Sequence, residues 1–234
     1  MPRRKKPDLK VNRLRNGIIA FVALLAVVVI GYGIVYSTGI TVGEYQAGTH
    51  YEVIDDAPPR RPGESIRVQE FFSYGCVHCR NFDPMIERWK QTLPEGVVFE
   101  RTPVAFSPAW TLLAQTYFAL DELGALERNH DRLFRAIHDS GRQFLTVDAV
   151  ADFVAGQGAS REEFLQAFNS EPVRRQVREA EMEQRAMRIA SVPTLVVAGR
   201  YRVGMDVGRK TVLDVTDYLI AEELAVRSDV TSSR

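Results

Sequence analysis

Cys76 and Cys79 are the only cysteines of the chain, and two residues, Val77 and His78, separate them. Two thiols at this spacing can close a disulfide with each other, so the pattern favours thiol–disulfide exchange. Haem attachment uses a similar spacing but needs a histidine directly after the second cysteine, where this chain has Arg80. A bridge that served only to clip the chain would add about 2 kcal/mol, which is little for a domain of this size.

A zinc site is the other chemistry open to a pair of cysteines. Zinc needs two further ligands, and His130 and His138 do not have a usual ligand spacing. We therefore interpret these two histidines as ordinary helix residues, either at the surface or with satisfied polar atoms. The sequence contains no complete ligand set and no glycine-rich phosphate loop, so we expect neither a metal nor a cofactor.

The sequence around the cysteines predicts a strand, a short turn and then a helix. Residues 66–72 alternate in polarity, as a strand with one apolar face does. Apolar side chains then recur at helical spacing at Phe82, Ile86, Trp89 and Leu93. The N-terminus of a helix stabilises an anion, so we expect a lowered thiol pKa at Cys76, with His78 as a further donor or cation. Cys79, one turn further, should be the more buried thiol that resolves a mixed disulfide.

Glu70 shares the apolar phase of the predicted strand with Ile66, Val68 and Phe72. A buried carboxylate costs several kcal/mol unless it is protonated, hydrated or paired. Two interpretations follow from the pattern. Either Glu70 is buried near the cysteines, or a bulge at Phe71 and Phe72 turns it toward water.

The rest of the chain predicts one α/β domain that contains a block of helices. Capping residues and apolar stripes place helices near 107–123 and 126–138 and helix starts at about 146, 160 and 172. Strands are predicted at 97–102, 194–197 and 201–203, the last two as a hairpin, and a final helix at about 209–225.

The composition excludes a nucleic-acid function. The 234 residues contain 30 Lys and Arg, 30 Asp and Glu, and 45% hydrophobic residues, which is typical of a globular protein with a sizeable core. Seven of the basic residues and one acid lie in residues 1–15, which leaves 23 basic and 29 acidic residues in the remainder. A body with this net negative charge has no basic face implied for nucleic acid.

The N-terminal region predicts a membrane anchor. Residues 17–36 carry no charge, and twenty helical residues span about 30 Å, the thickness of the hydrocarbon core of a bilayer. This run is longer than the apolar stretch of a cleaved signal peptide. The positive-inside rule keeps the basic arm, residues 1–16, in the cytoplasm. We expect a single uncleaved span, followed by a linker at 37–50 and an exported domain.

A further motif, Ser191-Val192-Pro193-Thr194, directly precedes the predicted hairpin. Together with the Glu70 strand, the Cys-x-His-Cys motif and the helical block, this pattern resembles the DsbA family of thiol–disulfide oxidoreductases. The likeness covers about residues 50–225. Val77 departs from it, because the best-known members have proline there, and the loop at 202–206 is short.

The resemblance implies a thioredoxin-like fold with an inserted α-helical domain. The thioredoxin-like part would comprise residues 51–104 and 189–227 and the insertion residues 105–188, with a frayed tail at 228–234. Cys76 would be the nucleophile, Cys79 the resolving thiol, Glu70 a buried acid beneath the pair and His78 the residue that tunes it. The Val192–Pro193 bond would be cis and would present the backbone of Val192 to an extended substrate.

The resemblance also implies the partners. These would be thiols of unfolded exported proteins and a quinone-linked membrane oxidase, similar to DsbB, that reoxidises the cysteines. The predicted anchor is a departure from the soluble members of the family, and it would hold the chain, as a monomer, in a bacterial cytoplasmic membrane with its catalytic domain in the periplasm. Two alternatives stay open at this point: an extracytoplasmic reductase or isomerase, and a tethered binding or chaperone module with incidental cysteines.

Overall fold

The structure is a computed structural model that describes residues 16, 18–26, 29–30, 45–55, 57, 59 and 63–232, with side chains up to Arg227. The chain divides into two compact units, residues 1–44 and 45–234. The second unit contains the predicted α/β domain.

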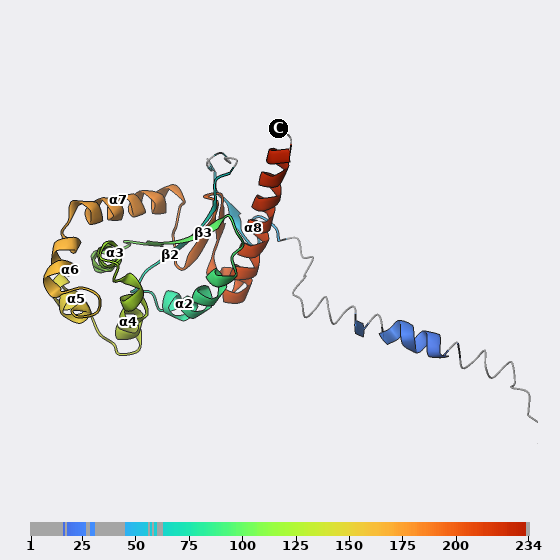
Figure 1. Cartoon of the computed structure of the whole chain (residues 1–234), viewed down its shortest axis with the longest axis horizontal. Helices are drawn as coiled ribbons and strands as arrows, with labels where there is room; N and C mark the ends of the chain where they lie inside the picture. The colour runs from blue at the N-terminus through green and yellow to red at the C-terminus, as the bar shows by residue number, and fades with distance from the viewer. Residues whose placement is uncertain are drawn as a thin grey trace, which may run out of the picture. The chain divides into compact units, whose positions relative to one another are not determined.

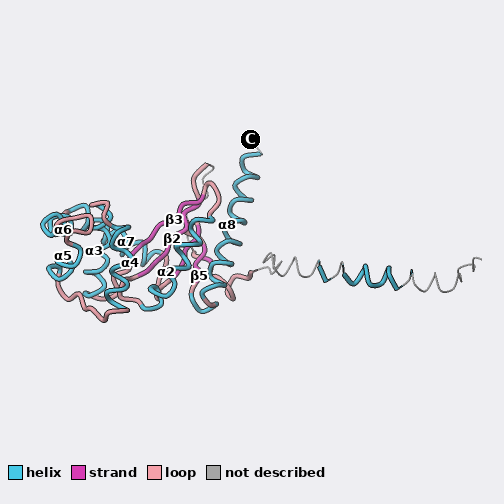
Figure 2. The backbone as a smooth tube through the Cα atoms, turned by 60° about the horizontal axis from the view of Figure 1, so that its bottom comes forward, coloured by secondary structure: helices cyan, strands magenta, loops and turns pink. Residues whose placement is uncertain are grey.

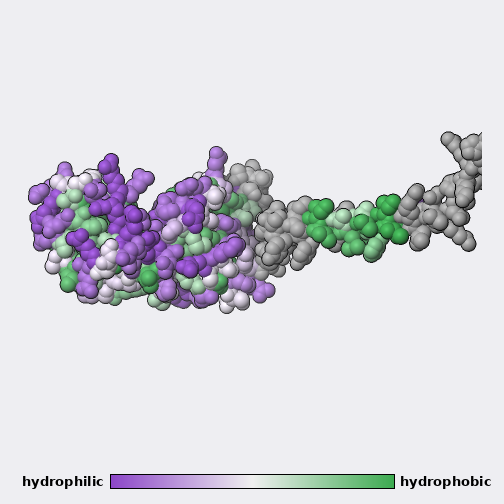
Figure 3. Space-filling model, turned by 90° about the horizontal axis from the view of Figure 1, so that it is seen from below, coloured by the Kyte–Doolittle hydropathy of each residue, from purple (hydrophilic) through white to green (hydrophobic). Residues whose placement is uncertain are grey.

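In the first unit, residues 18–26 and 29–30 are helical, and their apolar side chains form the hydrophobic surface of this segment in Figure 3. The other residues of the predicted anchor at 17–36, residues 1–15 of the arm and residues 37–44 of the linker lie outside the described residues. Among the residues that are described, no helix is both long enough and apolar enough to cross a bilayer. The membrane anchor therefore stays a prediction.

The second unit is built on a five-stranded sheet with the strand order β1-β5-β4-β2-β3. The strands are β1 (Glu52–Val53), β2 (Ile66–Phe72), β3 (Val97–Pro103), β4 (Thr194–Val197) and β5 (Tyr201–Val203). β2 pairs in parallel with β3 and antiparallel with β4, and the remaining neighbours are antiparallel. β2 thus lies inside the sheet, directly before the cysteines.

One face of the sheet is covered by α2 (Val77–Trp89) and α8 (Arg209–Ser232), with the short 3-10 turns η1 (Lys90–Thr92) and η2 (Met205–Val207) beside them (Figure 1). Buried side chains of both helices pack there against Ile66 and Val68 of β2. This burial fixes the phase of β2, so Glu70 points to the same side as α2.

The helical insertion follows β3 and returns to β4. It contains α3 (Pro108–Glu122), α4 (Leu126–His138), α5 (Val147–Val154), α6 (Arg161–Phe168) and α7 (Glu171–Ala186), which form a group beside the strands in Figure 2. Side-chain oxygens of Ser107, Thr146, Ser160 and Ser170 accept hydrogen bonds from backbone N–H groups in the first turns of four of them. The expected thioredoxin-like fold with an inserted helical domain is therefore present.

The core of the insertion extends to Cys76 and Cys79. One continuous cluster of buried side chains joins Phe72, Tyr74, Cys76 and Cys79 to the apolar faces of the inserted helices. The cysteines thus lie where the thioredoxin-like part meets the insertion, and both parts contribute to their surroundings.

Two elements differ from the sequence prediction. β1 is a two-residue edge strand that no periodicity could indicate, because it is held only by its pairing with β5. α8 continues to Ser232, beyond the predicted helix end near 225 and through most of the predicted tail at 228–234. Residues 226–232 contain no proline or glycine that would stop a helix.

Candidate active site

Cys76 is the N-cap residue of α2. Its backbone is extended (φ −98°, ψ 115°), and its Sγ accepts a hydrogen bond from the backbone N–H of Cys79 at 3.3 Å. A tight turn leads into this position, in which the Cys76 N–H donates to the Ser73 carbonyl at 3.0 Å. Only 7% of the residue is exposed, and Cys79 is fully buried. Both cysteines are free thiols in the structure.

These surroundings separate the acidities of the two thiols. The hydrogen bond with the Cys79 thiol lowers the pKa of Cys76 to about 6, against the opposing effect of burial. The backbone N–H groups of Cys79 and His78 and the charge of the exposed His78 contribute further to the lower pKa. Burial is the largest cause that raises the pKa of Cys79, and the hydrogen bond with Cys76 and the charge of Cys76 raise it further. Cys76 can therefore be a thiolate near neutral pH while Cys79 keeps its proton.

The segment 191–193 lies against the nucleophilic sulfur. The Val192–Pro193 peptide bond is cis, and the Val192 carbonyl oxygen lies 3.4 Å from Sγ of Cys76, which donates to it as a thiol. Val192 and Pro193 line an open groove of about 670 Å³, together with His78 and residues of the loop after β5. The structure thus brings together the residues that the two sequence motifs predicted.

Glu70 is buried, with 2% of its surface exposed, and β2 pairs through Glu70 without a bulge. The interpretation in which a bulge turns this carboxylate toward water is therefore wrong. Burial raises the pKa of Glu70, and the ion pair with Arg101 opposes that rise. The charge of Glu70 also contributes to the raised pKa of Cys79, after burial and the influence of Cys76.

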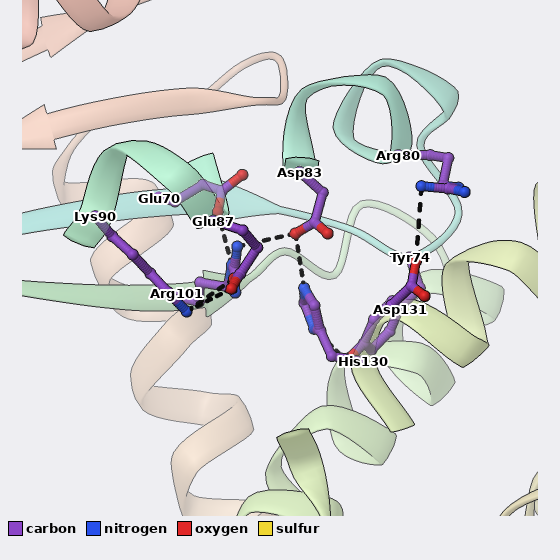
Figure 4. Close-up of polar contacts among 9 residues, drawn as sticks. All are labelled: Glu70, Tyr74, Arg80, Asp83, Glu87, Lys90, Arg101, His130 and Asp131. Atoms are coloured by element: carbon purple, nitrogen blue, oxygen red, sulfur yellow. Dashed lines mark hydrogen bonds and ion pairs between the residues drawn. The ribbon is translucent and has the colours of Figure 1, made fainter. Parts of the chain in front are cut away.

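Arg101 of β3 is the partner that makes the buried carboxylate tolerable, and the sequence did not single it out. Its Nε donates to Glu70 at 2.8 Å, and its two terminal nitrogens donate to Asp83 and Glu87 of α2, each at 2.9 Å (Figure 4). Glu70 and Arg101 are direct neighbours in the parallel register. The only signal in the sequence was one charged residue in each predicted strand, Glu70 and Arg101. It points to an ion pair only when the register of the two strands is known.

A second feature missed by sequence analysis is the close approach of Gly75 to Trp110 of α3. A Cβ atom at residue 75 would lie 2.5 Å from Nε1 of the Trp110 indole. The absence of a side chain therefore allows the insertion to approach the turn before Cys76 closely.

Comparisons with known proteins agree with this geometry. Residues 67–219 match the DSBA-like thioredoxin domain. A thiol:disulfide interchange protein DsbA of Pseudomonas aeruginosa is 37% identical over 185 residues, which are 78% of this chain and 87% of that protein. The corresponding protein of Azotobacter vinelandii is 37% identical over 183 residues, which cover 77% of this chain and 85% of the relative.

The chain belongs to the DsbA-like family. It is a thiol–disulfide oxidoreductase. The crystal structure of Pseudomonas aeruginosa DsbA matches with a TM-score of 0.75 and 34% identity, over 80% of this chain and 98% of that one. The DsbA oxidoreductase of Xylella fastidiosa matches with a TM-score of 0.73 and 34% identity, over 77% and 98% of the two chains.

The acidity of Cys76 predicts how the stability of the reduced protein depends on pH. A thiol pKa lowered from 9.0 to about 6 means that the folded state holds this proton less tightly than the unfolded state. The reduced protein should therefore gain stability over the oxidised protein as the pH rises from 6 to 9. The gain approaches about 3 kcal/mol by pH 9, where ionisation of Cys79 in the unfolded state begins to oppose it, and it is lost as the pH falls through the folded pKa of Cys76.

The measurement is denaturant unfolding of the reduced and oxidised proteins across this pH range. The oxidised protein is the control, because it has no thiol to titrate. A stability difference that stays constant with pH would contradict the lowered pKa.

Removal of the Arg101 guanidinium should cause a large loss of stability that depends on pH. Arg101→Met leaves the buried Glu70 and Asp83 without their cation and should cost about 3 to 5 kcal/mol near neutral pH. The loss should be smaller near pH 5 than near pH 8, because Glu70, whose pKa burial already raises, takes up a proton when its cation is gone. Arg67→Met is the matched control. Its side chain is 39% exposed, and its ion pairs should contribute no more than about 1 kcal/mol.

Urea unfolding of the two oxidised variants against the parent protein measures both effects. Equal losses of unfolding free energy in the two variants would show that Arg101 does not stabilise the buried carboxylates around it.

Proposed function

We propose that the chain is an oxidant that transfers its Cys76–Cys79 disulfide to thiols of exported proteins. The observation that carries this proposal is the stabilisation of the Cys76 thiolate by the Cys79 thiol and by the backbone N–H groups of Cys79 and His78 at the N-terminus of α2. A stabilised thiolate favours the dithiol form, so the disulfide form is a stronger oxidant. The names of the relatives, thiol:disulfide interchange proteins, support the same activity.

The proposed exchange has two steps. A client thiolate attacks Sγ of Cys76 in the disulfide, a client–Cys76 bond forms, and the sulfur of Cys79 leaves and takes up a proton. A second client thiolate then attacks the client sulfur of this mixed disulfide, and Cys76 leaves as a thiolate. Two electrons pass from the client to the enzyme, and the client gains one disulfide. The lowered pKa of Cys76 makes it a good leaving group in the second step.

The open groove beside Val192 and Pro193 supports an extended client segment as the substrate. Backbone groups at this edge can pair with a client by strand addition, in which main-chain hydrogen bonds provide affinity without a required sequence. This mode suits a catalyst that serves many unfolded proteins.

We place the enzyme at the outer face of a bacterial cytoplasmic membrane. The uncharged run at 17–36 and the basic arm before it support a single span with the arm in the cytoplasm. Because each turnover leaves the enzyme reduced, a partner must accept two electrons. A quinone-linked membrane thiol oxidase similar to DsbB is the partner that fits an anchored member of this family.

The direction of electron flow is tested by the reduction potential and by client oxidation. Known potentials run from about −270 mV for thioredoxin to about −120 mV for DsbA, and these values belong to those proteins. We expect this protein to lie well above the thioredoxin value and to oxidise a reduced, unfolded protein with two cysteines, one disulfide per enzyme molecule. Cys76→Ser should abolish the transfer, whereas Leu145→Ser, at an exposed position of the insertion, should leave it unchanged.

The redox state in cells separates the alternatives. Rapid alkylation should trap Cys76 and Cys79 mainly as a disulfide. A mainly reduced pair, with a potential near that of thioredoxin, would instead identify a reductase or isomerase.

The anchor is tested by membrane fractionation of the full chain. We expect the chain to stay with membranes after an alkaline carbonate wash. Leu24→Arg should weaken this retention, because arginine in the middle of a span costs about 3 kcal/mol, and Leu24→Ile should not. Release of the parent chain by the wash would refute the span while leaving the redox proposal intact.

A further inference from the structure

Tyr74, two residues before Cys76, is held at two points by the same helix of the insertion. Its hydroxyl lies 2.8 Å from Nδ1 of His130, and its backbone carbonyl accepts a hydrogen bond from Nε2 of His138 at 2.8 Å. Both histidines belong to α4, two helical turns apart. Sequence analysis interpreted them as ordinary helix residues, and the proposed exchange reaction does not use them.

The surroundings of His130 fix the direction of its hydrogen bonds. Its Nε2 lies 3.0 Å from Oδ1 of Asp83 (Figure 4). Burial alone would raise the pKa of Asp83, but the bond with His130 and the charge of Arg101 lower it on balance, so Asp83 is an ionised acceptor. Nε2 of His130 must therefore carry hydrogen. Burial also lowers the pKa of His130, so the ring is neutral and its Nδ1 accepts the hydrogen of the Tyr74 hydroxyl.

Tyr74 itself cannot adjust to the loss of these partners by moving to water. Its side chain is 1% exposed, and its ring packs edge-on against Phe72 and Phe134 at centroid distances of 5.3 and 5.0 Å. Burial raises its pKa well above the ordinary value of a tyrosine, so the hydroxyl stays a hydrogen-bond donor. The residue is thus fixed by packing, by its hydroxyl and by its carbonyl.

This fixed residue lies within the turn that sets the position of the nucleophile. The Cys76 N–H closes the turn on the Ser73 carbonyl, and Tyr74 is one of the two residues between them. On the other side of the cysteines, Arg80 forms an ion pair at 2.9 Å with Asp139, the C-cap residue of the same helix α4. One helix of the insertion therefore holds the chain immediately before and immediately after the two cysteines.

We propose that His130 and His138 are positioning residues for Cys76. By fixing both ends of Tyr74, they hold the turn from Ser73 to Cys76 in the conformation that places Sγ at the N-terminus of α2. The insertion then takes part in the chemistry of the thiol in addition to covering the domain. This inference deepens the proposed role of Cys76 as the nucleophile and rests on it.

The test measures the acid dissociation constant of Cys76 in the reduced full chain, from the ultraviolet absorbance of the thiolate as a function of pH. His138→Leu removes the donor to the Tyr74 carbonyl and should reduce this constant at least about threefold, because a displaced sulfur loses part of the stabilisation by the helix N-terminus. Tyr74→Phe removes only the hydroxyl and should reduce it about twofold.

Two further variants distinguish positioning from other effects. His138→Gln keeps an Nε donor without a titratable ring and should restore the parent value. Asn129→Leu removes the hydrogen bonds of another buried polar residue of α4, to the carbonyls of Ala125 and Gln157. It should lower the unfolding free energy without changing the acidity of Cys76.

Three results would overturn the proposal. These are an unchanged constant in both His138→Leu and Tyr74→Phe, an equal shift in Asn129→Leu, or a His138→Gln variant that behaves as His138→Leu. If His138→Leu does not fold, the acid dissociation constant of Cys76 in Tyr74→Phe decides the test, and an unchanged constant there overturns the proposal. The measurement needs no client and no redox partner. It therefore tests the positioning of Cys76 even if the enzyme proves to be a reductase or isomerase.

Discussion

The start of α2 at Cys76 is the constraint on which the chemistry depends, because it brings Sγ of Cys76 into contact with both the thiol and the backbone N–H of Cys79. It places the sulfur at the positive end of a helix, where negative charge is favoured, while the second sulfur lies one turn inside, where burial favours the neutral thiol. The difference in acidity between two chemically identical side chains is therefore a consequence of where the helix starts. The core of the insertion then protects this arrangement, because the two cysteines are part of its buried cluster.

The buried charges beneath the cysteines show a second constraint. Glu70, Asp83 and Arg101 lie between the sheet and α2, where little of each side chain is exposed. Each terminal nitrogen of Arg101, as well as its Nε, has its own carboxylate partner. An isolated acid at this depth would be protonated. The guanidinium fork, by contrast, can serve three carboxylates from one buried point. Asp83 also binds His130, so the charges under the sheet and the insertion belong to one connected network.

Much of this structure could be predicted from the sequence, because local rules decide it. The N-caps at Ser107, Thr146 and Ser160 and the strand before Cys76 follow from residue type and periodicity alone. The burial of Glu70 could be expected from its phase, but its partner Arg101 depends on the parallel register of two strands thirty-one residues apart in sequence. The contacts of His130 and His138 with Tyr74 depend on how a whole helix docks, which no local pattern specifies. The two-residue strand β1 exists only through its partner β5.

The close contact between Gly75 and Trp110 limits how such enzymes can be recombined. The turn before the nucleophile and the first inserted helix meet with no room for even one additional carbon atom. A chimaera that takes its cysteine motif from one relative and its helical insertion from another would therefore have to match the residue before the first cysteine to the indole that faces it. The motif and the insertion form a single interlocking part, although Gly75 and Trp110 are thirty-five positions apart in the chain.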